Sequence, residues 1–289
     1  MSRKTSSFVG FFPAFFFLAA SASAQCLVPQ DAIVNGGPGR DGIPSLTNPD
    51  VVSMGEGDSF LIPSDMVLGV VINGEARAYP QAILWWHEII NDVLGGKPIT
   101  VSFCPLTGSG LVYDPTIAAQ LHNFGVSGLL FDNNLILFDR QTDTLWSQMR
   151  IEGICGPQTS TSPKLLPVVQ STWGAWKALY PDTTVVSFNT GFSRNYDRYP
   201  YGDYDQPGNG DLLFPHSFID TRLPLKAVVL GVENRGVARA YPMSTLNSMG
   251  ARVAVNDEVN GRPVLIVSDK DSFMILSFER DLDDPAVPE

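Results

Sequence analysis

The sequence is poor in the residues that bind transition metals or build disulfide frameworks. It contains 3 cysteines and 3 histidines in 289 residues, with no C-x-x-C, H-x-x-H or H-E-x-x-H spacing. These counts argue against the common zinc sites and against a disulfide-stapled scaffold. The sequence also has no P-loop, no G-x-S-x-G, and no G-x-G-x-x-G that opens a predicted helix after a strand. The usual signatures of nucleotide binding and serine hydrolysis are therefore missing.

Positive charge is scarce as well. The 19 lysines and arginines are outnumbered by 30 aspartates and glutamates, which gives a formal net charge of −11 at pH 7. An acidic chain is a poor binder of nucleic acid, because affinity for phosphates depends on clustered lysine and arginine. Beyond the first 24 residues, no stretch approaches the roughly 20 consecutive apolar residues of a membrane-spanning helix. We therefore predict neither a nucleic-acid partner nor a membrane span in the mature chain.

The N-terminus has the pattern of an export signal. The apolar stretch Phe8–Ala20 follows a basic start, and the small residues at 22–24 resemble a cleavage site. We expect residues 1–24 to be removed and a soluble product to act in the periplasm or outside the cell. Cys26 raises the alternative of a lipoprotein anchor, but Gln25 before it fits poorly the small residue that such processing prefers.

An internal repeat organises the chain. LGVVINGEARAYP at residues 68–80 matches LGVENRGVARAYP at 230–242, with nine identities in thirteen ungapped positions. Each copy predicts a hairpin, turning at Asn73-Gly74 or Arg235-Gly236, followed by a helix and a buried strand. We predict an α+β fold that is dominated by strands, with short helices and an internally duplicated hairpin–helix–strand unit.

The expected domain boundaries follow from this repeat. We expect one duplicated α+β domain over residues 61–270, with copy one at about 67–104 and copy two at about 229–269. An N-terminal extension (25–60) precedes the domain, and an acidic C-terminal tail (271–289) follows it. We expect the last part of this tail, RDLDDPAVPE (280–289), to be a solvated end.

Local patterns predict further elements. QAILWWHEIIND (81–92) has apolar residues at helical spacing, SGLLFDNNLILFDR (127–140) indicates a hairpin turning at Asn133-Asn134, and STWGAWKALYP (171–181) indicates a short helix capped by Thr172. The segment GFSRNYDRYPYGDYDQPGNGD (191–211) contains four tyrosines, but it is polar and glycine-rich, so we expect a loop outside the core. Its aspartates do not follow the calcium-loop pattern, which favours a solvated loop over a calcium site.

The repeat also separates folding residues from candidate chemistry. Arg77 and Tyr79 recur in the second copy, so folding explains them more simply than chemistry. Cys104, in contrast, aligns with Asp269, and His87 has no histidine counterpart. Residues that occur in only one copy of the repeat, as Cys104 and His87 do, are expected where one copy carries an active site and the other does not.

Cys104 lies in VSFCPLTGSG, at the end of a predicted strand. Pro105 removes a backbone donor, and glycines follow that allow a close turn. A thiol beside free strand-end amides can be stabilised as the thiolate, which is the nucleophile and the metal ligand. The alternative is an inert buried cysteine. His87 could orient or deprotonate Cys104, or it could be a satisfied core histidine; Glu88 is expected to point elsewhere and to be solvated or to cap.

Three states are open for Cys155. A disulfide with Cys26 is plausible in an exported protein. Cys155 could instead act as a resolving partner for Cys104, or remain an exposed free thiol.

Several longer motifs resemble the uncharacterised family called domain of unknown function 3179. They are HEIIND, VSFCPLTGSGLVYD, FGVSGLLFDNNLILFDRQTDTLWSQ, FNTGFSRNYDRYPYGDY and LGVENRGVARAYP, and the resemblance spans about residues 67–267. Members of that family commonly carry a second cysteine, or a selenocysteine, in the turn after the first. The resemblance therefore implies a thiol-redox ancestry.

This chain departs from that form, because Thr107 occupies the position of the second thiol. The leading hypothesis is therefore a one-cysteine nucleophile. Cys104 would react, His87 would act as a polarising base, and the Thr107 hydroxyl would donate a hydrogen bond to the thiolate. The partner would be a small molecule or a redox partner, and the sequence assigns no cofactor.

The alternative hypothesis is a non-catalytic module that binds a small ligand or a metal. The aromatic helix and the tyrosine-rich loop would then shape a pocket. In the metal version, Met54, His122 or His216 would add ligands to Cys104 and His87.

Overall fold

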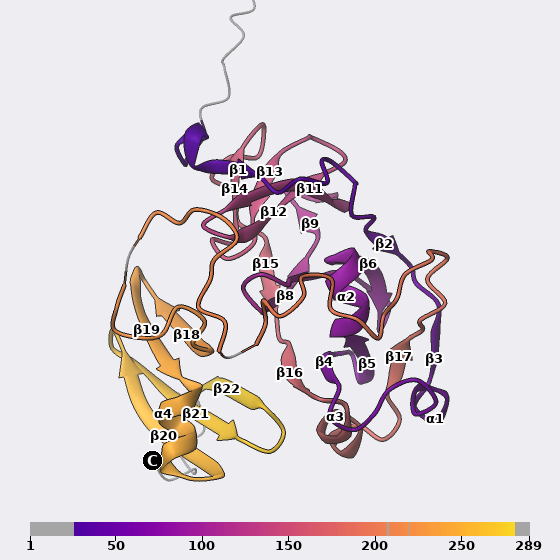
Figure 1. Cartoon of the computed structure of the whole chain (residues 1–289), viewed down its shortest axis with the longest axis vertical. Helices are drawn as coiled ribbons and strands as arrows, with labels where there is room; N and C mark the ends of the chain where they lie inside the picture. Colours follow the sequence, from indigo (N-terminus) through magenta and orange to yellow (C-terminus); the bar gives the residue numbers. More distant parts are fainter. Residues whose placement is uncertain (1–25, 207, 219, 281–289) are drawn as a thin grey trace, which may run out of the picture.

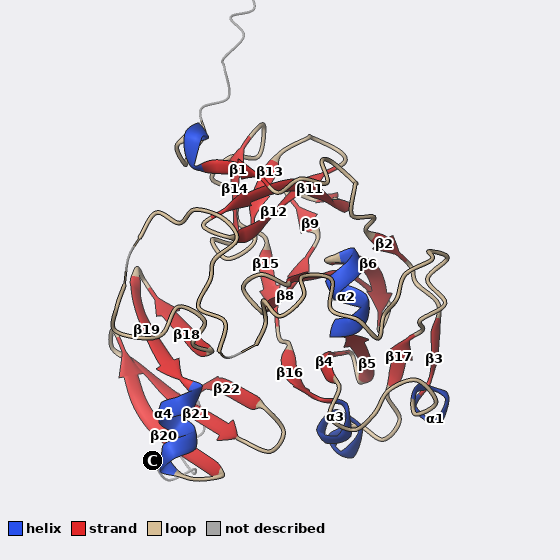
Figure 2. Ribbon diagram, viewed as in Figure 1, coloured by secondary structure: helices blue, strands red, loops and turns tan. Residues whose placement is uncertain are grey.

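The computed structural model describes residues 26–206, 208–218 and 220–280, which form several sheets and few helices (Figure 1). The expected α+β, strand-dominated architecture is confirmed (Figure 2). The helices are η1 (Gln30–Ala32, a 3-10 turn), α1 (Met54–Gly57), α2 (Gln81–His87), α3 (Trp173–Leu179) and α4 (Met243–Met249). The strands are β1 (Ile33–Asn35), β2 (Leu46–Thr47), β3 (Val51–Ser53), β4 (Met66–Ile72), β5 (Glu75–Pro80), β6 (Ile89–Leu94), β7 (Lys97–Cys104), β8 (Ser109–Asp114), β9 (Thr116–Ile117), β10 (Gln120–Leu121), β11 (Phe124–Phe131), β12 (Asn134–Asp139), β13 (Leu145–Ser147), β14 (Glu152–Cys155), β15 (Lys164–Leu166), β16 (Val169–Thr172), β17 (Thr184–Val186), β18 (Val229–Asn234), β19 (Val237–Pro242), β20 (Arg252–Val259), β21 (Arg262–Asp269) and β22 (Met274–Glu279).

The sequence predicts a signal peptide at residues 1–24 and no membrane span after it. Among the described residues, no helix has the length and apolar character needed to cross a membrane. The expected signal peptide, residues 1–24, lies outside the described residues.

Three five-stranded sheets build the larger part of the fold. Their strand orders are β1-β11-β12-β13-β14, β15-β8-β7-β6-β2 and β16-β4-β5-β17-β3. Strands β1, β2 and β3 come from the expected N-terminal extension, yet they pair with β11, β6 and β17. Residues 229–279 form the β18–β19 hairpin and the sheet β20-β21-β22. β22, which lies in the expected C-terminal tail, pairs with β21. The expected solvated end, residues 280–289, lies outside the described residues except for Arg280.

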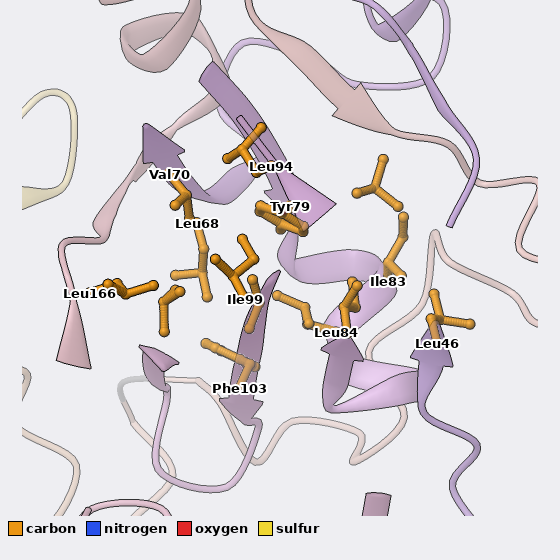
Figure 3. Close-up of a cluster of buried hydrophobic side chains, with 14 of the residues drawn as sticks. Leu46, Leu68, Val70, Tyr79, Ile83, Leu84, Leu94, Ile99, Phe103 and Leu166 are labelled. Atoms are coloured by element: carbon orange, nitrogen blue, oxygen red, sulfur yellow. The ribbon is translucent and has the colours of Figure 1, made fainter. Parts of the chain in front are cut away.

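The largest hydrophobic core lies between the β4–β5 hairpin, α2 and β7 (Figure 3). Leu68 and Tyr79 enter it from the hairpin, Leu84 from α2, and Ile99 and Phe103 from β7; all five are buried. β4 is largely buried along its whole length, which explains its uninterrupted apolar sequence. This core sets the position of β7, whose last residue enters the candidate site.

The helix predicted over residues 81–92 is shorter than expected. α2 ends at His87, and Glu88 adopts a left-handed backbone conformation with φ of 56°. Residues 89–94 then form β6, which pairs with β7 along its whole length. A short apolar run suits either a helix or a strand, so pairing with β7 decided the outcome.

Two other local predictions are confirmed. β11 and β12 form the expected hairpin, with Asp132 and Asn133 in the left-handed conformation at the turn, one residue earlier than expected. α3 is the expected short helix. Thr172 caps it, because its hydroxyl accepts a hydrogen bond from the Ala175 amide at 3.3 Å.

The two segments that match in sequence have the same order of elements. β4 and β5 are followed by α2, β6, β7 and β8, and β18 and β19 are followed by α4, β20, β21 and β22. In the first segment Arg77 and the Tyr79 hydroxyl both contact Asp92, at 2.6 and 2.8 Å. The corresponding residues make the same contacts: Arg239 and Tyr241 with Asp257, at 2.6 and 2.9 Å. These shared residues serve the fold in both segments, and duplication as their origin stays a prediction.

Candidate functional site

Cys104 is the last residue of β7, and only 1% of its surface is exposed. It pairs with Ser109 of β8 across a tight turn. Thr107 closes this turn by donating its amide to the Cys104 carbonyl at 3.3 Å. Gly108 has a φ of +59°, a conformation that favours glycine. The predicted position at a strand end is therefore confirmed, and the surrounding protein encloses the thiol.

Burial raises the pKa of the Cys104 thiol to about 11, and the nearby Glu88 carboxylate raises it as well. Hydrogen bonds from the Thr107 hydroxyl, the Thr107 amide and the Leu135 amide lower the pKa, because they stabilise the thiolate. The thiol donates a weak hydrogen bond to the Asn133 carbonyl, with a sulfur–oxygen distance of 3.7 Å. Amides near the strand end were expected to favour the thiolate; they are present, but burial outweighs them. Cys104 is therefore a neutral thiol at pH 7, with thiolate-stabilising donors already in place.

Glu88 is the carboxyl group whose negative charge raises the pKa of the Cys104 thiol. Its side chain is buried, with 7% of the residue exposed, and burial raises its pKa to about 8, opposed by a hydrogen bond from Tyr201. Its carbonyl accepts a hydrogen bond from the Phe103 amide at 2.7 Å, which holds Glu88 against β7. The expectation of a solvated Glu88 is wrong, because the positive φ at this residue directs the chain back toward β7 and its side chain is buried. Glu88 does stand at the C-cap of α2, where its amide donates to the Leu84 carbonyl at 2.9 Å.

A polar network that runs from the buried Asn134 and Gln148 to the exposed Thr107 holds the Thr107 hydroxyl beside Cys104. The Asn134 side-chain amide donates to this hydroxyl at 2.9 Å and to the Gln148 carbonyl oxygen at 2.8 Å. The Ser109 hydroxyl contacts both Thr107, at 2.7 Å, and Gln148, at 3.0 Å. Asn134 and Gln148 are buried, so water competes little for the hydrogen bond between them, whereas Thr107 lies at the exposed end of the network. The predicted proximity of Thr107 to the thiol is present in the structure.

Residues 190–204, here called the tyrosine loop, cover the turn that carries Cys104. The Tyr199 hydroxyl donates to the Pro105 carbonyl at 3.0 Å, and the Tyr201 hydroxyl bonds the Glu88 carboxyl group. Two other tyrosines of the loop are buried: Tyr196 with 7% and Tyr204 with 3% exposure. The expectation that this segment contributes nothing to the core is wrong, because its aromatic rings pack inward although its backbone is irregular.

His87 forms a hydrogen bond with the tyrosine loop and not with the Cys104 thiol. Its Nδ1 lies 2.7 Å from the Pro44 carbonyl oxygen, and its Nε2 lies 2.7 Å from the Tyr196 hydroxyl. The residue has 0% exposure, and burial lowers the pKa of the imidazole. Both ring nitrogens thus have partners, and among the described residues no hydrogen bond joins His87 to Cys104. The structure does not bring these two residues together as base and nucleophile.

Replacing Tyr196 with phenylalanine tests this role of His87. The hydroxyl that joins His87 to Thr190 is then lost, and we expect the tyrosine loop to open more often. Alkylation of Cys104 by iodoacetamide in the native protein is expected to become about fivefold faster, corresponding to the roughly 1 kcal/mol value of such a hydrogen bond. Mass spectrometry at pH 8 measures the rate. Tyr180→Phe, outside the loop, is the control, and equal rates in the two variants would contradict the assignment.

Cys155 is not available to Cys104, because it forms a disulfide with Cys26. The Leu27 amide also donates to the Ile154 carbonyl at 2.8 Å, which fastens the start of the described chain to β14. Cys104 is the free cysteine. The resolving-partner alternative for Cys155 and a lipid anchor on Cys26 both conflict with this disulfide, since both sulfurs are used. A disulfide is consistent with an exported protein.

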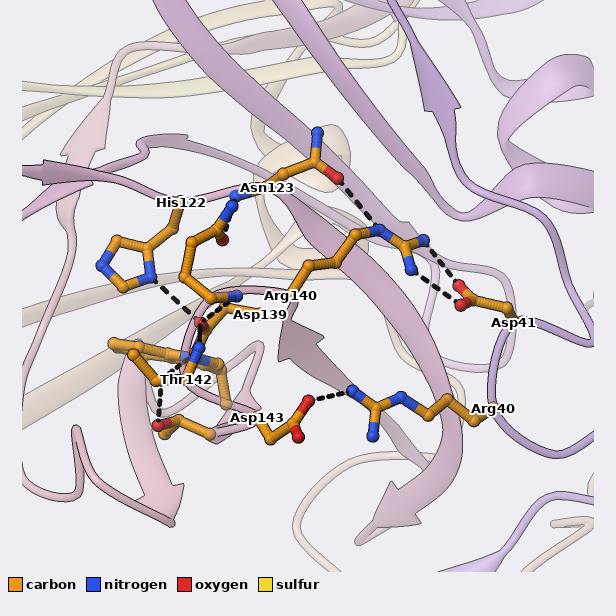
Figure 4. A network of polar contacts seen from close by, with 11 residues as sticks. Arg40, Asp41, His122, Asn123, Asp139, Arg140, Thr142 and Asp143 are labelled. Carbon is orange, nitrogen blue, oxygen red and sulfur yellow. Dashed lines mark hydrogen bonds and ion pairs between the residues drawn. The ribbon is translucent and has the colours of Figure 1, made fainter.

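His122, considered above as a metal ligand, lies in a separate buried site. Its Nδ1 is 3.1 Å from an Asp139 carboxylate oxygen, at an angle outside hydrogen-bond geometry (Figure 4). Asp139 accepts hydrogen bonds from Thr142 at 2.7 Å and from the Trp146 indole at 2.9 Å. Burial raises the pKa of Asp139, but these hydrogen bonds outweigh burial and lower the pKa below its ordinary value. The carboxylate is therefore satisfied by protein donors.

The metal hypothesis finds no support in the part of the chain that the structure describes. There, no group of three or more histidine, cysteine, aspartate or glutamate side chains is placed to hold an ion. The other proposed ligands lie apart: Met54 packs beside the α3 cluster, and His216 is exposed.

Fold and site together define a strand-dominated α+β protein with a buried free thiol beneath an aromatic loop. Over residues 40–288, nearly its whole length, the chain matches the family described as "Protein of unknown function (DUF3179)", and it belongs to that family. Comparison with curated proteins and with solved structures found no match. The chemistry of the site is therefore the guide to function.

Proposed function

We propose that this protein reduces small hydroperoxides, with Cys104 as the nucleophile and Glu88 as its base. The observation that supports the proposal is a buried thiol near a buried carboxyl group, with pKa values of about 11 and about 8. Burial dominates both shifts, the Glu88 charge adds to that of Cys104, and strongly perturbed acids that lie near one another are typical of catalytic sites. The Thr107 and Leu135 donors add to the argument, because they would stabilise negative charge on sulfur only as it develops.

The proposed reaction is the two-electron oxidation of Cys104 by a hydroperoxide. The Glu88 carboxylate accepts the thiol proton while the sulfur attacks one peroxide oxygen. An S–O bond forms, the O–O bond breaks, and the departing oxygen takes the proton from Glu88 and leaves as an alcohol or water. Sulfur loses two electrons, so Cys104 becomes a sulfenic acid.

An external reductant of the low-molecular-weight thiol class completes the cycle. One thiol forms a mixed disulfide with Cys104 and releases water, and a second thiol then frees Cys104 and leaves as the oxidised disulfide. The chain has no spare thiol for this step, because Cys26 and Cys155 are joined. The enclosure of Cys104 favours an oxidant that is small enough to enter as the tyrosine loop opens.

Trapping of the sulfenic acid tests the proposal. With hydrogen peroxide and dimedone at pH 8, we expect one dimedone on the peptide containing Cys104, detected by mass spectrometry, and none in Cys104→Ser. Thr107→Val is expected to slow the reaction about tenfold or more, by analogy with loss of a charge-stabilising donor, and Thr107→Ser is the matched control that keeps the hydroxyl. A labelling level equal to that of Cys104→Ser would overturn the proposal and favour the non-catalytic binding module.

A further inference from the structure

Residues 169–186, here called the strap, enclose the β4–β5 hairpin. β16 pairs antiparallel with β4, α3 packs against β4, and β17 pairs parallel with β5. Figure 1 shows β16 and β17 on either side of the hairpin, with α3 between their ends. One continuous segment therefore covers both edges and one face of this hairpin.

The strap places an indole ring directly on a glycine. A Cβ atom at Gly69 would lie 2.1 Å from the Trp176 ring, so only glycine leaves room for this contact. Val67 and Ala78, on the same face, have 0% exposure and form one cluster with Trp173 and Trp176. This face is shaped to receive the aromatic side chains of a short helix.

The β18–β19 hairpin keeps the glycine but has no strap. Gly231 corresponds to Gly69 in the repeat, and nothing lies within 4 Å of a Cβ placed on it. Val229, the counterpart of Val67, is 41% exposed, and Ala240 is exposed. Within the described residues β18 and β19 pair only with each other. No strand in the described part of the chain therefore pairs with either edge of this hairpin, and no described segment covers the face that carries Gly231.

Neither the backbone nor the core explains the glycine at 231. Its φ is outside the left-handed region, and the pairing of β18 with β19 is regular. The opposite face of the hairpin already packs into a core, where Leu230 and Tyr241 meet Leu246. A glycine inside a strand is roughly 0.5–1 kcal/mol less favourable than alanine and often marks the close approach of another group.

We propose that the β18–β19 hairpin is the docking site of a partner protein that presents a strand–helix–strand segment like the strap. The strands of the partner would pair with the free edges, where unpaired backbone groups are available. An aromatic side chain of its helix would rest on Gly231, between Val229 and Ala240. We therefore expect the partner to present a short helix with aromatic residues one turn apart, as Trp173 and Trp176 are in the strap. The inference does not depend on the chemistry of Cys104.

A peptide of this chain serves as the probe. Fluorescein-labelled residues 167–188 contain the strap, and we expect saturable binding to the full chain by fluorescence anisotropy. Gly231→Val should weaken binding about tenfold or more, because a loss of contact worth about 1.4 kcal/mol changes the affinity tenfold. In the chain without peptide, nothing described lies within 4 Å of a Cβ at position 231, so the valine has space. The thermal unfolding midpoint of Gly231→Val should therefore not fall. Ala240→Lys is the second variant, and the peptide with Trp176→Ala is the matched ligand control.

Three results would overturn the proposal. The first is the absence of saturable binding at millimolar peptide, and the second is binding that Gly231→Val leaves unchanged. The third is a dimer of the chain, observed by analytical sedimentation, that Gly231→Val dissociates although no peptide binds. That outcome would assign the face to a second copy of this chain.

Discussion

Replacement of Arg77 with alanine is expected to lower the free energy of unfolding by about 3–5 kcal/mol, the typical cost of breaking a buried ion pair by removing one partner. The Arg77 guanidinium lies 2.6 Å from Asp92, and these side chains are 12% and 4% exposed. The Tyr79 hydroxyl donates to the same carboxylate oxygen at 2.8 Å. Without Arg77, Asp92 would keep a buried charge with only the tyrosine and backbone donors. Urea unfolding followed by tryptophan fluorescence, with the disulfide intact, measures the loss.

The chain supplies its own control in Arg239→Ala. Arg239 and Asp257 make the same contact at 2.6 Å, but their side chains are 50% and 28% exposed. Exposed pairs contribute little, because water and salt screen them. We expect a much smaller loss of stability in Arg239→Ala than in Arg77→Ala. Equal losses in the two variants would show that burial does not set the strength of this contact.

Replacement of Glu88 with glutamine is expected to slow oxidation of Cys104 by hydrogen peroxide about 100-fold or more at pH 9, the usual range for loss of a general base. In the wild type, the rate should rise as pH passes through about 8, because Glu88 then becomes a carboxylate that can accept the thiol proton. Stopped-flow measurement of sulfenic acid formation between pH 6 and 10 gives this profile. Glu88→Gln should lack the step near pH 8 and show only the increase that follows ionisation of the Cys104 thiol itself.

A purely electrostatic role for Glu88 predicts the opposite sign. Its negative charge raises the pKa of Cys104, so glutamine would lower that pKa, increase the thiolate fraction and speed the reaction. A faster Glu88→Gln variant would therefore contradict the base assignment. Tyr201→Phe is the matched control: the Tyr201 hydrogen bond lowers the pKa of Glu88, so its loss should move the rise in rate to higher pH without abolishing it.

Elements with short-range causes were predicted well. The Asn73-Gly74 turn joins β4 to β5 as expected, because left-handed residues suit a two-residue hairpin turn. The Thr172 cap and the helix that follows it depend on neighbours within a few residues. The strand ending at Cys104 also follows from its alternating apolar sequence and from Pro105 after it.

The surroundings of Cys104 were predicted only in part. Thr107 was found because it is close in sequence, but Glu88 was missed because the apolar spacing around it suggested one continuous helix. His87 was expected to act on the thiol, whereas its partners are Pro44 and a tyrosine 109 residues further along. Contacts at such separations leave no local pattern from which to predict them.

The sequence by itself determined the strand-dominated class, the repeated hairpin–helix order and the family, because alternation, turn residues and motif identity are properties of short segments. Only the tertiary structure decided that Cys26 joins Cys155, that Glu88 turns toward Cys104, and that the tyrosine loop closes over the thiol. These features depend on burial and on groups brought together from distant parts of the chain. Burial is also what keeps Cys104 protonated at neutral pH.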